Sequence, residues 1–513
     1  MPERKEQQTI VERPPVVVIM GHIDHGKSTL LDYIRHSNIV AKESGGITQH
    51  LGAYEIEHKN SDGITKKITF LDTPGHSAFC GVRARGAKVA DIAILIISAE
   101  DGVMPQTIEA LECIKNDKLS FIVAINKIDS PRANIEKVKN DLIENQIYVE
   151  GYGGTIPAVE ISAVTGANIN GLLDLILVAS EVEGLKADTS SMAEGFVIEA
   201  HKDKNKGISA TLIIKDGTLK QGQFVACQGN LSPVRIFEDH DGKSIKSATV
   251  SKPVKICGWN AFPVVGEKFQ AFDTKKEAEK SCDLFKELFL AQKSKESQNG
   301  FAKNNDNSGE EKIFTVPIII KADTHGSIEA VEHELKKMPT INSKIRIVSI
   351  GTGNISEIDV KTASGNENSI IVGFGIDIDK QAEIMIDRLN VVTKTFDIIY
   401  ELVDWIEKEI ENKRPRIEVE ESVGKSKILK KFNETKSNQV LGARVLSGIM
   451  KVSSEVKIWR RGEDIGRGKI KEIQSQKTKV TEITEGNEFG LCIESKYEIV
   501  PGDEIEIIEK VKK

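Results

Sequence analysis

Eight residues near the start of the chain have the types and the spacing that phosphate binding requires. They fit the pattern GxxxxGK[ST] and are Gly21, His22, Ile23, Asp24, His25, Gly26, Lys27 and Ser28. In such a loop, glycines allow backbone N–H groups to surround the phosphates, and the helix that follows adds a favourable dipole. We expect Lys27 to reach the β- and γ-phosphates and Ser28 to coordinate Mg²⁺. The alternative is a glycine-rich turn without a ligand, so the motif needs support from other segments.

A second segment directly follows the strand-like run 68–71 and consists of Asp72, Thr73, Pro74, Gly75 and His76. The Asp72 carboxylate can hold Mg²⁺ through a water molecule, and Gly75 offers a backbone N–H where a γ-phosphate would lie. Only GTP supplies that phosphate, so the segment has a reason to differ between the GTP and GDP states. The alternative is an ordinary Pro-Gly turn, but the position at the end of a core strand favours nucleotide binding.

A third segment follows the strand-like run 121–125 and consists of Asn126, Lys127, Ile128 and Asp129. The Asp129 carboxylate can accept two hydrogen bonds from guanine, from N1–H and from the exocyclic amine. Adenine lacks this pair of donors and would leave the carboxylate unpaired, which is unfavourable. We expect Ser162 and Ala163, after the last strand, to close the base pocket. The three segments together predict a site for GTP or GDP.

The first third of the chain alternates short strand-like runs with helical stretches. The runs, rich in β-branched residues, are 16–20, 68–71, 92–97, 121–125 and 158–161. Stretches such as 28–36 and 107–116 are long enough for crossover helices, and 172–183 has the pattern of a closing helix. The alternation predicts a mostly parallel, doubly wound sheet, which binds ligands at the carboxyl ends of its strands.

The rest of the chain changes character twice. Short strands broken by Gly, Pro and Asn predict a small β-barrel at 195–272, followed by a helix at 274–293. The polar stretch 294–312 predicts a flexible linker. A second α/β unit and a helical stripe at 398–412 come next, before a last β-rich region.

Composition narrows the class of protein. The chain has 513 residues, of which 39% are hydrophobic and 29% charged, and no apolar run reaches the roughly 18 residues of a membrane span. The first ten residues are polar, so we expect no secretory signal and a cytoplasmic location. Six isolated cysteines predict reduced thiols rather than a zinc site or disulfides. The net charge of −7 argues against a uniformly basic nucleic-acid-binding coat, although residues 444–479 hold ten Lys and Arg against four Asp and Glu.

The three nucleotide motifs resemble those of the translational GTPases of the elongation- and initiation-factor superfamily. A narrower resemblance, to bacterial translation initiation factor two, covers the chain from about Pro14 to the C-terminus. The segments that carry it are 45–54, 83–86, 101–107, 321–330 and 397–400.

This resemblance implies roles for four residues. Thr48 would join Mg²⁺ and the γ-phosphate, together with Ser28 and Asp72 (the last through water). His76 would be the catalytic residue that positions the attacking water, and the alternative for it is a solvated turn histidine. Ile23 and Ile47 would form an apolar gate that holds His76 away until the ribosome reorients it. Hydrolysis would therefore be weak alone and fast on the ribosome.

The resemblance also implies a multidomain α/β plus β fold. Its parts would be a P-loop GTPase domain, a β-barrel, an α/β/α sandwich module, a long connecting helix and a C-terminal β-barrel. The expected boundaries are 1–13 for a short tail, 14–184 for the GTPase domain, 193–272 for barrel domain II, 273–312 for a helix and flexible linker, 313–397 for the α/β/α module, 398–414 for the connecting helix and 415–513 for the C-terminal barrel.

The function implied is that of a ribosome-dependent GTPase of translation initiation. It would promote binding of formylmethionyl initiator tRNA to the small ribosomal subunit and joining of the large subunit, with GTP hydrolysis when the 70S ribosome forms. The implied partners are both subunits, through ribosomal RNA, and initiator tRNA, with other initiation factors as further candidates. We expect a monomer with no membrane contact. The basic excess at 444–479 suits phosphate contacts with RNA, its alternative being a solvated β surface.

The sequence departs from the family in two places. Ala443 and Phe489 stand where bacterial members usually have cysteines in the formyl-methionine pocket. Phe489 could crowd that pocket or supply a different apolar wall, which leaves the strictness for the formylated end open. Only about a dozen residues precede the first strand, so we expect ribosome binding to depend on the GTPase and barrel domains.

Two other functions compete with this interpretation. An elongation-type carrier of aminoacyl-tRNA would have further β-barrels where this chain has an α/β/α pattern at 313–397. A scaffold that binds GTP without hydrolysing it is argued against by Lys27, Thr48 and His76, which are all present.

Overall fold

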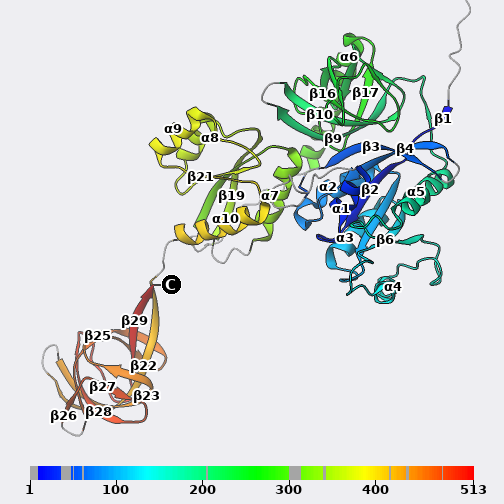
Figure 1. The fold of residues 1–513 in the computed structure, drawn as a ribbon. Helices are drawn as coiled ribbons and strands as arrows, with labels where there is room; N and C mark the ends of the chain where they lie inside the picture. Colours follow the sequence, from blue (N-terminus) through cyan, green and yellow to red (C-terminus); the bar gives the residue numbers. More distant parts are fainter. Residues whose placement is uncertain are drawn as a thin grey trace, which may run out of the picture. The chain divides into compact units, whose positions relative to one another are not determined.

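The computed structural model describes residues 10–35, 48–49, 51–60, 63–203, 206–299, 314–338, 343–414, 418–434, 438–475 and 478–512. The chain divides into two compact units, Met1–Lys413 and Arg414–Lys513, and each is described by itself (Figure 1). Within the described residues, every helix is too short or too polar to span a membrane.

The first sheet of the larger unit has six strands in the order β3-β4-β2-β5-β6-β7, all parallel except β3. The strands are β2 (Val16–Gly21), β3 (Gly52–Lys59), β4 (Thr65–Asp72), β5 (Ile92–Ser98), β6 (Ser120–Asn126) and β7 (Ala158–Glu160). Their β-branched runs are buried because helices cover both faces. The helices are α1 (Lys27–Arg35) and α5 (Ile169–Glu183) on one face, and α2 (Cys80–Val89), α3 (Pro105–Asn116) and α4 (Ile135–Glu144) on the other. The predicted doubly wound sheet is confirmed.

A short pairing joins the two ends of this region. Strand β1 (Ile10–Glu12) runs antiparallel to β8 (Lys186–Asp188). Residues 10–12 belong to the segment predicted as a short tail, and this part of it forms a strand. Strands of three residues are too short to show a period-2 pattern, and their pairing depends on where the chain ends meet in space.

The second sheet is curled and antiparallel, in the order β13-β12-β17-β9-β10-β16-β14. Its strands are β9 (Glu194–Asp203), β10 (Gly207–Asp216), β12 (Phe224–Cys227), β13 (Asn230–Pro233), β14 (Ile236–Asp239), β16 (Pro253–Cys257) and β17 (Lys268–Phe272), with β11 (Leu219–Lys220) paired to β15 (Ser247–Ala248) beside it. Helix α6 (Lys275–Asn299) follows and enters the stretch predicted as a flexible linker. Lys, Glu and Gln there favour helix even without an apolar stripe. Residues 300–313 lie outside the described part.

The third sheet is parallel, in the order β19-β18-β20-β21. Its elements are β18 (Phe314–Ala322), α7 (His325–Lys337), β19 (Ser343–Thr352), α8 (Glu357–Ser364), β20 (Ile370–Phe374), α9 (Lys380–Leu389), β21 (Val392–Phe396) and α10 (Ile399–Lys413). Helices α7 and α10 cover one face, and α8 and α9 the other. The predicted α/β/α sandwich and connecting helix are confirmed, and α9 and β21 are additional.

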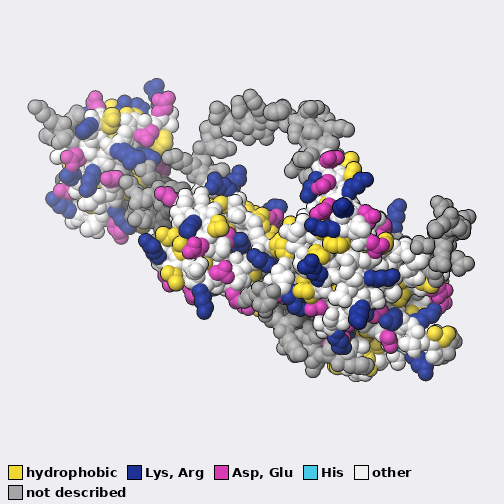
Figure 2. Space-filling model, turned by 90° about the horizontal axis from the view of Figure 1, so that it is seen from above, with side chains coloured by type: hydrophobic (Ala, Val, Ile, Leu, Met, Phe, Trp, Pro, Cys, Tyr) yellow, Lys and Arg dark blue, Asp and Glu magenta, His cyan; other side chains and the backbone are white. Residues whose placement is uncertain are grey.

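The C-terminal unit is a closed antiparallel barrel. Strands follow one another in the order β22-β29-β24-β25-β28-β23, and a direct β22–β23 pairing closes the ring. They are β22 (Glu418–Glu434), β23 (Asn438–Lys451), β24 (Glu455–Arg460), β25 (Glu463–Ser475), β28 (Glu488–Ser495) and β29 (Glu504–Lys512), with β26 (Thr478–Val480) and β27 (Glu482–Thr484) at its margin. Basic and acidic side chains alternate over the visible faces of both units (Figure 2).

Candidate nucleotide-binding site

The loop between β2 and α1 needs glycine at two close approaches. Gly21 has φ +149°, and a Cβ there would lie 2.4 Å from the Ile96 carbonyl oxygen on the neighbouring strand. Gly26 has φ +88°, and its Cβ would lie 2.3 Å from Asn126 Nδ2. Both positions therefore exclude side chains. Asp24 also has a positive φ, of 62°, which completes the turn.

Lys27 is buried at the first turn of α1. Its Nζ donates to the carbonyl oxygens of Gly21 at 3.0 Å and His22 at 2.6 Å. Burial lowers the pKa of Lys27 to about 8, and the nearby Asp72 carboxylate opposes that shift. A phosphate would supply the negative charge that two neutral carbonyls lack, so the ammonium is placed to gain from an anionic ligand.

Three oxygen donors from separate segments meet beside Lys27. Ser28 Oγ lies 2.8 Å from Thr48 Oγ1, and Thr48 Oγ1 donates to Asp72 Oδ2 at 3.3 Å. These oxygens are the hard ligands that Mg²⁺ prefers. Ser28 and Thr48 border a cavity of about 250 Å³. It is lined by Ile23, Asp24, Gly26, Lys27, Ser28, Thr29, Thr48, Gln49, Gly75, His76 and Phe79.

The predicted base-binding residues form one hydrogen-bonded group. Ser162 Oγ donates to Asp129 Oδ1 at 2.6 Å, and the Ala163 N–H donates to Asn126 Oδ1 at 2.9 Å. Asn126 Nδ2 donates to the His25 carbonyl oxygen at 2.9 Å. Asn126 therefore joins the base loops to the phosphate loop. Ile128 supports this group through its N–H, 3.4 Å from the Ile161 carbonyl oxygen.

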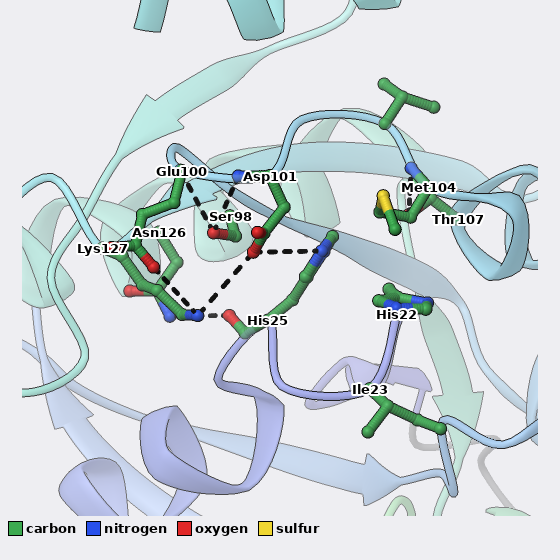
Figure 3. Close-up of polar contacts among 12 residues, drawn as sticks. His22, Ile23, His25, Ser98, Glu100, Asp101, Met104, Thr107, Asn126 and Lys127 are labelled. Carbon is green, nitrogen blue, oxygen red and sulfur yellow. Dashed lines mark hydrogen bonds and ion pairs between the residues drawn. The ribbon is translucent and has the colours of Figure 1, made fainter. Parts of the chain in front are cut away.

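The two histidines of the phosphate loop lie against a polar cluster behind it (Figure 3). His25 Nε2 is 4.0 Å from Asp101 Oδ2, and Lys127 Nζ is 3.5 Å from Glu100 Oε2. Burial lowers the pKa of His25 to about 4, so its imidazole is neutral at pH 7. The rings of His22 and His25 pack in an edge-on arrangement, with 5.0 Å between their centroids. We predicted both histidines to bind the nucleotide. Because the His25 ring is buried, we expect His25 to contribute through its backbone.

His76 is held by its own backbone turn. Its Nδ1 accepts the Ala78 N–H at 2.8 Å and so caps the short 3-10 helix η2 (Ser77–Phe79). Only 8% of the residue is exposed, and burial lowers the pKa of the imidazole, against the opposing charge of Glu334. A neutral ring with Nδ1 accepting carries its hydrogen on Nε2. Ile23 lines the same cavity, whereas Ile47, the other predicted gate residue, lies outside the described residues.

Arg83 is a residue whose role the motifs did not reveal. Its side chain is 1% exposed on α2, and Nη1 donates to the carbonyl oxygens of Pro74 at 3.3 Å, Gly75 at 3.2 Å and His76 at 2.5 Å. Nη2 donates to Glu109 at 2.8 Å. On the other side of the segment, Thr73 Oγ1 donates to the Ile19 carbonyl oxygen at 2.7 Å. The sequence of α2 has no clear apolar stripe, so no local pattern marked Arg83 as buried.

In the C-terminal unit, Ala443 on β23 lies directly opposite Phe489 on β28. Both side chains point into the hydrophobic core of the barrel with Leu441 and Leu491. The structure therefore brings the two predicted tRNA-pocket residues together, but as core side chains.

Four family models match consecutive parts of the chain. They are the elongation factor Tu GTP binding domain at 12–181, elongation factor G domain 2 at 192–272, translation-initiation factor 2 at 290–407 and elongation factor Tu domain 4 at 423–507.

Curated relatives extend this similarity over nearly the whole chain. Translation initiation factor IF-2 of Bacillus cereus (strain G9842) is 39% identical over 516 residues, covering 100% of this chain and 74% of that protein. The factor of the same name from Rhizobium etli is also 39% identical, covering 97% of this chain; the chain spans 54% of its length. The crystal structure of GDP-bound aIF5B from Aeropyrum pernix aligns with 97% of this chain and 92% of its own, at 24% identity and a TM-score of 0.47.

Proposed function

Because this chain belongs to the translation initiation factor 2 family, we propose that it is a ribosome-dependent GTPase of translation initiation. It promotes binding of formylmethionyl initiator tRNA to the small ribosomal subunit and joining of the large subunit. GTP is hydrolysed to GDP and phosphate when the 70S ribosome forms.

One observation carries the proposal. Lys27, Ser28, Thr48 and His76 border a single cavity, although they come from three segments of the sequence. This is the set that phosphoryl transfer to water requires: a cation for the phosphates, oxygen ligands for a metal and a group to orient water. The match to the translation-initiation factor 2 model at 290–407 favours initiation over an elongation-type carrier.

Each residue of the site has a separate role. Ser28 and Thr48 would hold Mg²⁺, with Asp72 contributing through water, and the metal would offset charge on the phosphate oxygens. Lys27 binds the β- and γ-phosphates. The Gly75 N–H binds the γ-phosphate and so distinguishes GTP from GDP. Asp129 selects guanine.

His76 orients the attacking water through its Nε2–H. Its Nδ1 already accepts the Ala78 N–H, so the neutral ring acts here as a donor rather than as a base. Ile23 lines the same cavity as His76 and forms part of an apolar gate, which keeps the His76 ring from the nucleotide until ribosome binding moves the ring. Turnover without ribosomes is therefore slow.

The C-terminal barrel binds the acceptor end of initiator tRNA, and its basic side chains contact RNA phosphates. Phe489 and Ala443 lie in the core, so they act by shaping the wall beneath the binding surface. We expect binding of formylated initiator tRNA to the full chain to change when Phe489→Cys alters that wall. Equal binding of formylated and unformylated tRNA by the unchanged chain would refute formyl recognition.

The proposed function is tested by GTP turnover and tRNA recruitment. We expect multiple-turnover hydrolysis to rise by ~10³-fold or more when 70S ribosomes are added. Initiator tRNA should be retained on small subunits with GTP and less with GDP. Fast turnover without ribosomes would contradict the gate, and absence of turnover with ribosomes would overturn the proposed activity.

A further inference from the structure

The start of helix α10 and the turn just before it contact both segments that adjoin the predicted γ-phosphate position. The Gln49 side-chain Nε2 donates to the Asp397 carbonyl oxygen at 2.8 Å. The ring of Tyr400 lies on His76, with 4.5 Å between ring centroids and a tilt of 58°. Gln49 directly follows Thr48, a predicted Mg²⁺ ligand. Four consecutive residues, 397–400, therefore touch both segments.

Helix α10 holds Tyr400 in place. Ile399, Leu402 and Ile406 on this helix are fully buried in the core of the α/β/α module. Tyr400 projects from the same turn but is 47% exposed. Its backbone is therefore fixed by the packing of its neighbours, while its ring is available to His76 rather than used in that core.

The imidazole of His76 has few other restraints. Nδ1 is held by the Ala78 N–H, and the Phe79 ring contacts it edge-on at 6.3 Å between centroids. Arg83 contacts His76 at the backbone carbonyl and not at the ring. Tyr400 is the nearest aromatic ring to the imidazole among the described residues, and its removal would leave one side of the imidazole open.

Gln49 is the second part of the junction. Its side chain is buried and lines the same cavity as His76. Because Nε2 donates to Asp397, the orientation of the amide is set. Its Oε1 is buried without a hydrogen-bond partner among the described residues. A buried acceptor without a hydrogen-bond partner costs free energy, so the contact between Gln49 and Asp397 forms beside the cavity despite that cost.

We propose that Tyr400 is a positioning residue for His76: its ring holds the imidazole in the starting orientation from which ribosome binding brings His76 to the attacking water. This inference rests on the proposed function of His76. Tyr400 acts through His76 and is not one of the described residues that line the cavity. The contact with His76 is made by the ring of Tyr400 and not by its hydroxyl, so phenylalanine at this position should position His76 equally well.

Three variants of the full chain test this. Tyr400→Ala should lower the ribosome-stimulated kcat about tenfold, with KM for GTP unchanged within about twofold because the phosphate loop is intact. Tyr400→Phe should retain the unmodified kcat. Tyr148→Ala is the matched control, because Tyr148 is 46% exposed on the same unit and away from the cavity; it should change neither constant.

A spectroscopic signature separates this inference from the proposed function. In the chain labelled with ¹³C-histidine, the ring signals of His76 are assigned by their loss in His76→Ala. We expect the ring-current shift from Tyr400 to disappear in Tyr400→Ala and to remain in Tyr400→Phe. An unchanged His76 signal or an unchanged kcat in Tyr400→Ala overturns the inference, as does equal loss of kcat in both variants. Lack of ribosome-stimulated turnover in the unmodified chain would instead overturn the proposed function.

Discussion

At the scale of residues, the capacity of each functional group depends on which of its hydrogen bonds are already made. Asp129 is exposed and uses Oδ1 for Ser162, so its other lone pairs remain for a base. His76 uses Nδ1, so Nε2–H remains for water. His25 is buried and neutral, which leaves its carbonyl as the useful group.

Asp129→Asn should exchange guanine selectivity for xanthine selectivity. The amide presents a donor where the carboxylate accepted, which suits the extra carbonyl of xanthine and opposes the amine of guanine. We expect GDP affinity to fall by ~10²-fold or more and xanthosine diphosphate affinity to rise, measured by calorimetric titration. Unchanged preference for guanine would refute the assigned base contact.

His76→Ala should abolish most ribosome-stimulated hydrolysis and spare nucleotide binding. A group that orients or transfers protons in the transition state contributes about 10²–10⁴-fold to the rate, whereas the phosphate loop does not depend on this side chain. Stopped-flow binding and multiple-turnover rates measure the two properties. A parallel loss of affinity would show that His76 has a structural role.

At the scale of elements, helix α2 organises the segment that carries His76. Its buried side bears Val82 and Arg83, and the guanidinium ties three successive carbonyls to Glu109 on α3. One planar group therefore fixes a loop that has no regular structure of its own. A lysine has a single point of charge and cannot reproduce this geometry.

Arg83→Lys should lower the ribosome-stimulated rate about tenfold and destabilise the protein by about 1–3 kcal/mol, because buried carbonyls lose donors. GDP affinity should stay within about threefold. Arg132→Lys is the control, since the Arg132 side chain is 81% exposed. Urea unfolding and turnover assays measure both effects. Unchanged stability and rate in Arg83→Lys would contradict the role of the guanidinium group.

At the scale of the larger unit, Asp91 joins three parts of the chain. Its carboxylate accepts both terminal nitrogens of Arg13, at 2.6 and 2.7 Å, the Lys215 Nζ at 2.7 Å and the Val16 N–H at 2.8 Å. Burial raises the pKa of Asp91. The hydrogen bond and charge of Arg13 and the charge of Lys215 lower it by more, so the pKa lies below its ordinary value. Burial lowers the pKa of Lys215 to about 8. The N-terminal segment, the parallel sheet and strand β10 thus share one buried ion cluster.

Asp91→Asn should cost about 3–5 kcal/mol at pH 7, because two buried cations lose their carboxylate. Since the native pKa of Asp91 is lowered, its contribution is complete above the unfolded value near 3.8 and is lost as the pH falls through the native value. The difference between the unmodified chain and the variant, measured by urea unfolding, should therefore narrow as the pH falls below 3.8. A constant difference down to pH 3 would refute the assignment.

The sequence by itself determined the parallel sheet, the order of the nucleotide motifs and the choice of guanine, because these depend on local periodicity and on short spacings next to strand ends. It also predicted roles for Lys27, Asp129 and His76. Tertiary structure alone decided what surrounds them. His76 and Tyr400 are 324 positions apart (400 − 76), and the pairing of β1 with β8 and the Asp91 cluster likewise join distant segments. Such contacts depend on how whole elements dock, which no local pattern encodes.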